Sequence, residues 1–142
     1  SGPPRPAAKT SRPDSGPHVA SLEEYQALNV DEFNTMGQKM VARAGFQVSR
    51  EIRDGLTDAS RELLFISLKK GAKGAEIFVR VDRIHAEIGL IPLNDFVSLM
   101  ETHHCAKGVY LTSATVSPAG AKFIKDHPEI TVVDASKISK YF

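Results

Sequence analysis

The sequence predicts an α/β fold in three layers (αβα), with a mixed central sheet and the element order αβββαβαβα. Two observations lead to this fold class. Three β-rich segments follow one another between residues 46 and 82 with only turn signals between them, which is typical of an antiparallel meander. Beyond residue 90, helical patterns alternate with short apolar strands, and such strands need right-handed helical crossovers that cover the faces of the sheet. The 142 residues suffice for one such domain.

The first 27 residues are expected to form a disordered, proline-rich linker, with the folded domain covering residues 28–142. Residues 1–18 contain five of the eight prolines and no large aliphatic or aromatic side chain. Such a segment buries too little apolar surface to offset the entropy of ordering its backbone. We therefore expect a linker that joins this domain to the rest of a longer protein.

The first predicted helix starts near residue 28 and is followed by a strand. Asn29 and, three residues later, Glu32 form a capping-box pattern, and apolar residues then recur at helical spacing up to residue 44. Gly45 supplies a stop signal for the helix. Residues 46–53 alternate between apolar and polar side chains, which predicts a strand.

Two further strands complete the predicted meander. Asp54 and Gly55 form a turn signal, and residues 62–69 (ELLFISLK) are apolar and β-rich enough for a buried strand. The two glycines of residues 70–75 permit the positive φ angles that a hairpin loop requires. Residues 76–82 (EIFVRVD) then alternate as the third strand.

The second half of the chain is predicted to contain helix, strand, helix, strand and a final helical segment. Ser117 before a proline matches an N-cap followed by proline at the first helical position. The predicted segments are 93–106, 108–112, 118–126, 130–133 and a last turn or helix capped by Ser136.

Composition excludes several classes of protein. Cys105, the single cysteine, cannot form an internal disulfide, and a zinc site would need several Cys or His ligands at short spacings. The formal net charge of +1 gives no global positive field. The sequence has no glycine-rich nucleotide loop, no GxSxG motif, no secretion signal and no apolar run near the ~20 residues that span a bilayer. We therefore expect a cytoplasmic protein without a membrane span.

Several segments together resemble a known family. They are the stretch from Glu32 and Phe33 to AGFQV at 44–48, KGVYLTS at 107–113, the helix at 117–123 with Ala121, and ITVVD at 130–134. With these segments in order, residues 28–142 resemble a Mrr-like restriction endonuclease domain of the PD-(D/E)XK nuclease superfamily. The resemblance implies a restriction-endonuclease-like fold and, in active members, a phosphodiesterase whose carboxylates hold Mg²⁺ while a lysine helps to activate water.

The chain departs from the family at the catalytic positions. The family's opening helix usually carries a glutamate where Asn34 stands. The carboxylate expected near the start of the second strand corresponds to Asp58 or Glu62. At the end of the third strand, the family has Glu or Gln, any residue and then Lys, but here Arg80 and Asp82 stand in those places.

These substitutions leave two hypotheses. Whether the domain is an enzyme stays open, and the substitutions favour the hypothesis that it is not. The first is a nuclease-like domain that has lost catalysis and needs no cofactor, because a guanidinium cannot bind a cation and Asp82 cannot replace a lysine. The alternative is a Mg²⁺-dependent DNA endonuclease that uses Asp58 or Glu62 with Asp82. In that case Asp58 and Asp82 would ligate the metal, and Lys69 or a neighbouring lysine would supply the cation.

Basic residues on the meander give the predicted DNA-binding surface. They are Lys69, Lys70, Lys73, Arg80 and Arg83, in the region where this superfamily approaches DNA. Charges that guard exposed strand edges explain the same residues equally well. The expected partners are therefore double-stranded DNA, a protein, or the rest of a longer chain.

Three other polar groups have structural explanations of at least equal weight. His103, His104 and Cys105 are adjacent on a predicted helix and project about 100° apart, so they cannot all reach one ion. His85 and Glu87 could face one side of an extended segment, but they lack further metal ligands. The hydroxyl-rich residues 113–117 could hold a phosphate or serve as turn and cap residues.

Overall fold

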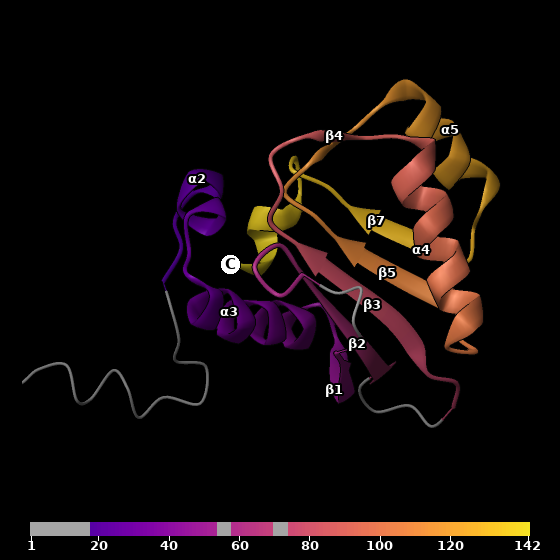
Figure 1. The fold of residues 1–142 in the computed structure, drawn as a ribbon, viewed down its shortest axis with the longest axis horizontal. Helices are drawn as coiled ribbons and strands as arrows, with labels where there is room; N and C mark the ends of the chain where they lie inside the picture. Colours follow the sequence, from indigo (N-terminus) through magenta and orange to yellow (C-terminus); the bar gives the residue numbers. More distant parts are fainter. Residues whose placement is uncertain (1–17, 54–57, 70–73) are drawn as a thin grey trace, which may run out of the picture.

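A computed structural model describes residues 18–53, 58–69 and 74–142 (Figure 1). Its main sheet has five strands in the order β1-β2-β3-β5-β7, and two short strands form a separate parallel ribbon. The main strands are β1 (Phe46–Ile52), β2 (Glu62–Lys69), β3 (Ile77–Asp82), β5 (Lys107–Leu111) and β7 (Ile130–Val133). The ribbon consists of β4 (Glu87–Ile88) and β6 (Thr115–Val116). The helices are α2 (Leu22–Gln26), α3 (Val30–Arg43), α4 (Leu90–Thr102) and α5 (Pro118–Asp126), followed by the 3₁₀ helix η1 (Ile138–Tyr141).

The strand pairing confirms the predicted mixed sheet. β1, β2 and β3 are antiparallel to one another, whereas β5 pairs parallel with β3 and β7 pairs parallel with β5. The predicted order of helices and strands from residue 28 onward is also observed. The sequence analysis missed α2 and the β4–β6 ribbon, and the last predicted helical segment is a 3₁₀ turn.

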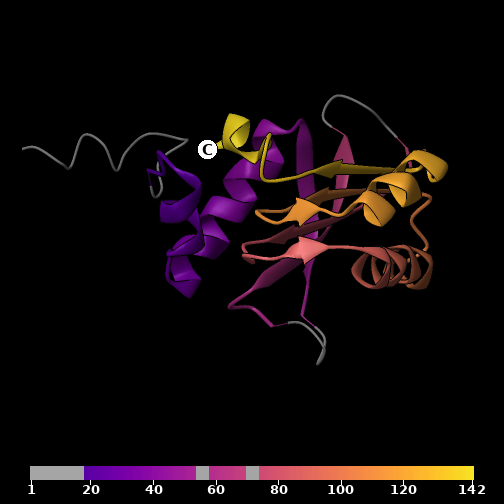
Figure 2. The same cartoon turned by 90° about the horizontal axis from the view of Figure 1, so that it is seen from above.

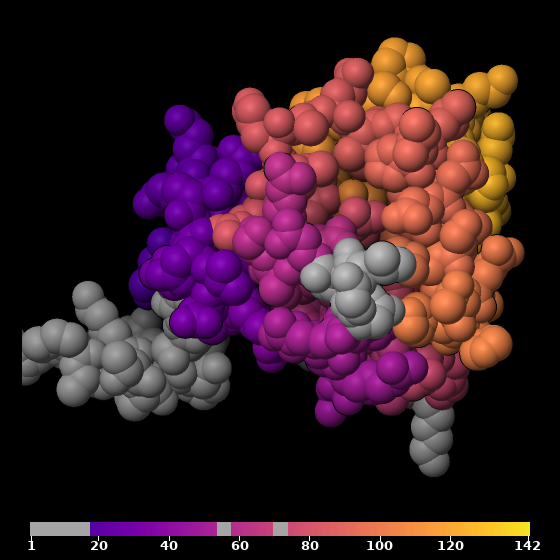
Figure 3. All heavy atoms as spheres, in the orientation of Figure 1, coloured from indigo at the N-terminus to yellow at the C-terminus, as the bar shows by residue number. Residues whose placement is uncertain are grey.

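The sheet separates two hydrophobic cores, because side chains alternate between its faces (Figure 2). Phe65 and Val81 point toward α3, where they pack with buried residues of that helix. Phe78 and Tyr110 belong to the core on the opposite face, which is covered by α4 and α5. Figure 3 shows the same layering on the molecular surface, with α2 and α3 in indigo at one side and the α4 segment in orange at the other.

The capping box that predicted α3 is present. The Asn29 side chain accepts a hydrogen bond from the Glu32 amide at 2.8 Å, and the Glu32 carboxylate accepts one from the Asn29 amide at 3.2 Å. Two of the four amides that a helix start leaves unpaired are thereby satisfied. Local sequence therefore determines where α3 begins.

The predicted linker boundary at residue 27 is corrected by α2. Tyr25, in this short helix, is fully buried and stacks on Phe142, with 5.1 Å between ring centroids. It also packs edge-on against Phe33, with ring centroids 6.0 Å apart. A single aromatic residue in a polar segment gives no periodic signal, and its burial depends on residues far along the chain. Residues 1–17 of the predicted linker lie outside the described residues.

Close packing of α4 against β5 requires a glycine. α4 begins at Leu90, three residues before the predicted start, and two of its side chains pack against Gly108 in β5. A Cβ atom at Gly108 would lie 2.7 Å from the Met100 sulfur and 2.8 Å from the Phe96 ring. The glycine therefore sets how closely the helix approaches the sheet. No helix among the described residues is long and apolar enough to cross a membrane.

Candidate functional site

The residues at the family's catalytic positions lie at one end of the sheet, on the face covered by α4. Glu62 at the start of β2 pairs in register with Asp82 at the end of β3. Arg80 pairs in register with Tyr110 on β5. Because side chains alternate along a strand, Glu62, Arg80 and Asp82 project from the same face, beside Tyr110. The structure therefore brings together three of the predicted site residues.

Arg80 occupies the centre of this group. Its guanidinium forms an ion pair with the Glu62 carboxylate at 2.5 Å and lies over the Tyr110 ring, 5.0 Å from the centroid. Asp95, within α4, is a more distant partner, at 3.9 Å. The Arg80 side chain is only 13% exposed, so the Glu62 pair is largely shielded from water. Its Nε and Nη1 atoms are buried without a hydrogen-bond partner among the described residues.

Asp82 is buried, and hydroxyl groups occupy both of its carboxylate oxygens. Thr112 donates to Oδ1 at 2.5 Å, and the Tyr110 hydroxyl donates to Oδ2 at 2.6 Å. The Tyr25 hydroxyl donates to the backbone carbonyl of Asp82 at 2.7 Å. The carbonyl is thus held by α2, and the side chain is held by β5 and the residue that directly follows it.

Burial dominates the ionisation of these acids. It raises the pKa of Asp82, while the hydrogen bonds from Thr112 and Tyr110 and the charge of Arg80 act in the opposite direction. Burial also raises the pKa of Glu62, against the opposing effect of Arg80. The pKa of the Tyr110 hydroxyl is raised by its burial and by the neighbouring Asp82 carboxylate. Tyr110 is therefore a hydrogen-bond donor at ordinary pH.

Asp58, the other candidate carboxylate, has a different role. It is exposed, and its Oδ1 accepts hydrogen bonds from the Ser60 amide at 3.0 Å and the Ser60 hydroxyl at 2.6 Å. These bonds lower the pKa of Asp58. The backbone carbonyl of Asp58 accepts from the amides of Arg61 and Glu62, so this residue closes the turn that leads into β2.

These residues do not fit the magnesium site that the family resemblance implies. Mg²⁺ needs carboxylate oxygens that are free to enter an octahedral shell. Glu62 Oε2 is paired with a guanidinium, whose positive charge repels a metal ion, both Asp82 oxygens accept hydroxyl hydrogen bonds, and Asp58 Oδ1 accepts from Ser60. Within the described ranges, no group of three or more His, Cys, Asp or Glu residues could hold a metal ion.

Asn34 and the lysines of the meander do not join this group. The Asn34 side chain accepts a hydrogen bond from Gln38 along α3 at 2.7 Å. Lys69 lies at the other end of the eight-residue strand β2, about 23 Å from Glu62 at the usual strand rise. Lys70 and Lys73 lie outside the described residues. The predicted basic surface is therefore divided, with Lys69 at one end of the sheet and Arg80 and Arg83 at the other.

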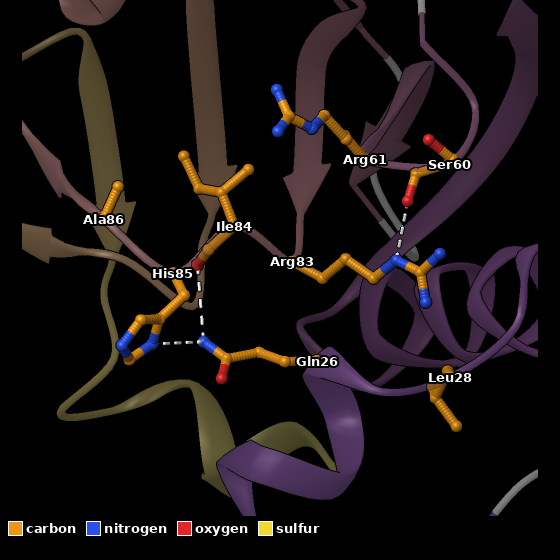
Figure 4. Close-up of a pocket in the computed structure, with 8 residues that line it drawn as sticks. All are labelled: Gln26, Leu28, Ser60, Arg61, Arg83, Ile84, His85 and Ala86. Atoms are coloured by element: carbon orange, nitrogen blue, oxygen red, sulfur yellow. Dashed lines mark hydrogen bonds between the residues drawn. The ribbon is translucent and has the colours of Figure 1, made fainter.

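A polar cleft lies at the same end of the sheet as the Glu62–Arg80 pair, between α2 and the loops that flank β2 and β3 (Figure 4). Its volume is about 510 Å³. Arg83 is fixed there, because its Nε donates to the Ser60 carbonyl at 2.7 Å and its guanidinium lies 4.7 Å from the centroid of the Phe33 ring. The lining residues are Gln26, Leu28, Ser60, Arg61, Arg83, Ile84, His85 and Ala86.

Several of these residues were not predicted from the sequence. Arg61 and Gln26 belong to no sequence motif, and the sequence indicated His85 only as a possible metal ligand. Tyr110 and Thr112 stood within the GVYLT segment, but their contact with Asp82 depends on the parallel register of β3 and β5. Alternation along both strands, combined with that register, is the signal that could have found them.

The remaining polar groups have structural roles. His103, directly after α4, stacks on Phe78 with ring centroids 5.6 Å apart. Cys105, two residues further along the chain, is buried. Ser113 donates to the Ile84 carbonyl at 2.6 Å. Ser117 caps α5 by accepting from the Gly120 amide at 3.0 Å, as its sequence position predicted.

Comparison with known proteins identifies the family. A comparison with curated proteins gave no match. Among solved structures, the DNA modification-dependent restriction endonuclease AspBHI is similar at 18% sequence identity and a TM-score of 0.44, over 89% of this chain and 36% of that chain. This chain thus spans little more than a third of the length of that protein. The family model Mrr_cat, described as a restriction endonuclease, matches residues 25–142. The chain therefore belongs to the Mrr family of restriction endonuclease domains.

Proposed function

We propose that this domain is a non-catalytic member of its family that binds double-stranded DNA as a module of a larger protein. The observation that carries the proposal is the ion pair between Arg80 and Glu62, next to an Asp82 carboxylate whose two oxygens are hydrogen-bonded. In the family pattern, these three positions hold a metal-binding acid, a second acid or glutamine, and a lysine.

The chemistry of the substituted side chains supports loss of catalysis. Arg80 keeps its positive charge at any ordinary pH and so repels a metal ion from the place of a metal ligand. Asp82 carries negative charge or none, so it cannot stabilise a phosphate as a lysine does. Lys69, the candidate replacement that lies within the described residues, is at the far end of β2 from Glu62 and Asp82.

Retained DNA binding is supported by the family and by the cationic side chains at this end of the sheet. Three arginines lie next to strand ends here: Arg61 directly precedes β2, Arg83 directly follows β3, and Arg53 directly follows β1. Contacts between such side chains and phosphates release counterions and give affinity that depends little on base sequence. With a net charge of only +1, we expect a dissociation constant of roughly 1 µM or weaker at physiological salt.

A cleavage assay tests the loss of catalysis. The purified chain should leave supercoiled plasmid intact in Mg²⁺ or Mn²⁺, and Glu62→Gln should behave identically. Cleavage by the wild type that is abolished by Glu62→Gln or Asp58→Ala would refute the proposal and establish the metal-dependent endonuclease instead. Cleavage unaffected by both substitutions would indicate a contaminating nuclease.

A binding assay tests the DNA role separately. Fluorescence anisotropy with a labelled duplex should show binding that weakens steeply between about 50 and 200 mM salt. If no binding is measured at the low-salt end, DNA is not the partner, and docking to a protein becomes the surviving role.

A further inference from the structure

Two arginines at the edge of the cleft shown in Figure 4 lie opposite each other in the backbone pairing. Arg61 directly precedes β2, and Arg83 directly follows β3. The amide of Arg83 donates to the carbonyl of Arg61 at 3.1 Å, one step beyond the Glu62–Asp82 pair in the strand register. Like charges directly opposite each other on neighbouring strands destabilise a sheet. In Figure 4 the two side chains extend in different directions, which keeps their guanidinium groups apart.

These two charges are not neutralised by ion pairs within residues 18–53, 58–69 and 74–142. The arginines that form ion pairs within these ranges are Arg53 and Arg80. The charges of both arginines lower the pKa of Asp58, but less than its hydrogen bonds to Ser60 do. The cleft therefore has an excess of positive charge.

The cleft is also built to receive a polar ligand rather than an apolar one. Arg83 is held in place by the Ser60 carbonyl and by the Phe33 ring, so little entropy is lost when its free N–H groups bind. On the opposite wall, the Gln26 amide nitrogen lies 3.4 Å from the Ile84 carbonyl oxygen and 3.4 Å from His85 Nδ1. None of the residues that line the cleft in the described part of the chain is acidic.

We propose that this cleft binds the sugar–phosphate backbone of a DNA strand, with Arg61 and Arg83 contacting phosphate groups and His85 at the opposite wall. This inference rests on the proposed DNA-binding function and locates the contact. The planar fork of a guanidinium group matches the oxygens of a phosphate. Two guanidinium groups that lie apart can each contact a different phosphate along one DNA strand. The contact surface is then the α3 side of the strand ends, not the Lys69 end of the meander.

The test compares two neutralising substitutions at opposite ends of the same strand. Arg61→Gln removes an exposed cleft charge that forms no ion pair with any other residue in the described part of the chain, and Lys69→Gln removes an exposed charge at the far end of β2. Arg83 is left intact, because its contacts with Ser60 and Phe33 support the fold. A third variant, Arg61→Gln with His85→Gln, removes both exposed basic side chains of the cleft.

Binding of the full 142-residue chain to a labelled duplex is measured by fluorescence anisotropy from about 50 to 200 mM salt. We expect Arg61→Gln to weaken binding by about tenfold at low salt and to lower the salt slope by about 1, while Lys69→Gln changes neither. Unchanged thermal unfolding of each variant shows that the fold is intact.

The possible results separate the two proposals. If the wild type binds DNA and both cleft variants bind equally well, the cleft assignment is overturned while the DNA-binding function stands. If Lys69→Gln has the larger effect, the contact lies at the far end of the sheet and the assignment is again wrong. If the wild type binds no duplex at the low-salt end, both proposals fail. Inorganic phosphate that shifts the NMR amide signals of residues 60–61 and 83–85 would then indicate a site for free phosphate instead.

Discussion

The hydrogen bonds around Asp82 predict that Thr112 stabilises the fold far more than its size implies. Thr112 is fully buried, donates to Asp82 Oδ1 at 2.5 Å and accepts from the Ala114 amide at 3.0 Å. Thr112→Val keeps the shape of the side chain but removes both bonds. The Asp82 bond is to a buried carboxylate, and the Ala114 amide would also lose its partner, so we expect a loss of about 3 kcal/mol in the free energy of unfolding.

Thr112→Ser is the matched control. It keeps the hydroxyl group and loses one methyl group, which costs about 1 kcal/mol in a buried site. Urea denaturation at pH 7 measures both variants. For a domain of this size, Thr112→Val should also lower the melting temperature by roughly 10 °C. If the two variants differ by less than about 0.5 kcal/mol, the hydroxyl contributes little and the reasoning is refuted.

The pH dependence tests which protonation state of Asp82 the hydroxyl supports. The Thr112 hydrogen bond favours the ionised carboxylate, so its removal raises the folded-state pKa of Asp82 further above the usual value. The destabilisation by Thr112→Val should therefore be largest at neutral pH and should shrink as pH falls through the folded-state pKa. A destabilisation that stays constant from pH 7 down to the acid transition would contradict a bond to an ionised carboxylate.

Two further substitutions test how the site is supported. Tyr25→Phe removes the hydroxyl that donates to the Asp82 carbonyl and should cost about 1 kcal/mol, with faster hydrogen exchange in α2 as the specific readout. Gly108→Ala should lower the free energy of unfolding by about 1 to 3 kcal/mol in urea denaturation, because the new methyl group would collide with Met100 and Phe96. Equal stability of the variant and the wild type would show that these side chains can move away from the sheet.

Local sequence signals predicted the elements whose ends they determine. The Asn29 capping box and the Ser117 cap with its following proline each involve residues within a single turn, and both are present. α2 also begins at a local signal that the sequence analysis missed, because Ser21 caps it by accepting from the Glu24 amide at 3.1 Å. What the local sequence does not show is the burial of Tyr25, which depends on its contact with Phe142 at the other end of the chain. The short ribbon strands β4 and β6 likewise depend on each other and carry too few residues for a periodic signal.

The candidate site was predictable in its residues but not in its contacts. The family pattern pointed to Asp58 or Glu62 together with Arg80 and Asp82, and the antiparallel pairing of β2 and β3 places Glu62 beside the last two. Lys69, predicted to bind DNA together with the arginines, lies at the other end of the sheet from Arg80, because the predicted grouping did not consider the antiparallel register of β2 and β3. The same limitation concealed Arg61, whose position opposite Arg83 follows only from the strand register.

Arg80 and Asp82, which we propose to be substituted catalytic positions, are coupled to each other and to Glu62, so we expect that reverting either one alone to the family pattern would not restore a nuclease site. Arg80→Gln alone would leave the Glu62 and Asp82 carboxylates, both with pKa values raised by burial, without the cation between them. Asp82→Lys alone would place a buried ammonium group beside the Arg80 guanidinium. It would also remove the carboxylate to which the hydroxyls of Tyr110 and Thr112 donate. Each single change therefore leaves buried charge without compensation, and only a joint replacement of Arg80 and Asp82 would free Glu62 while keeping the charges balanced.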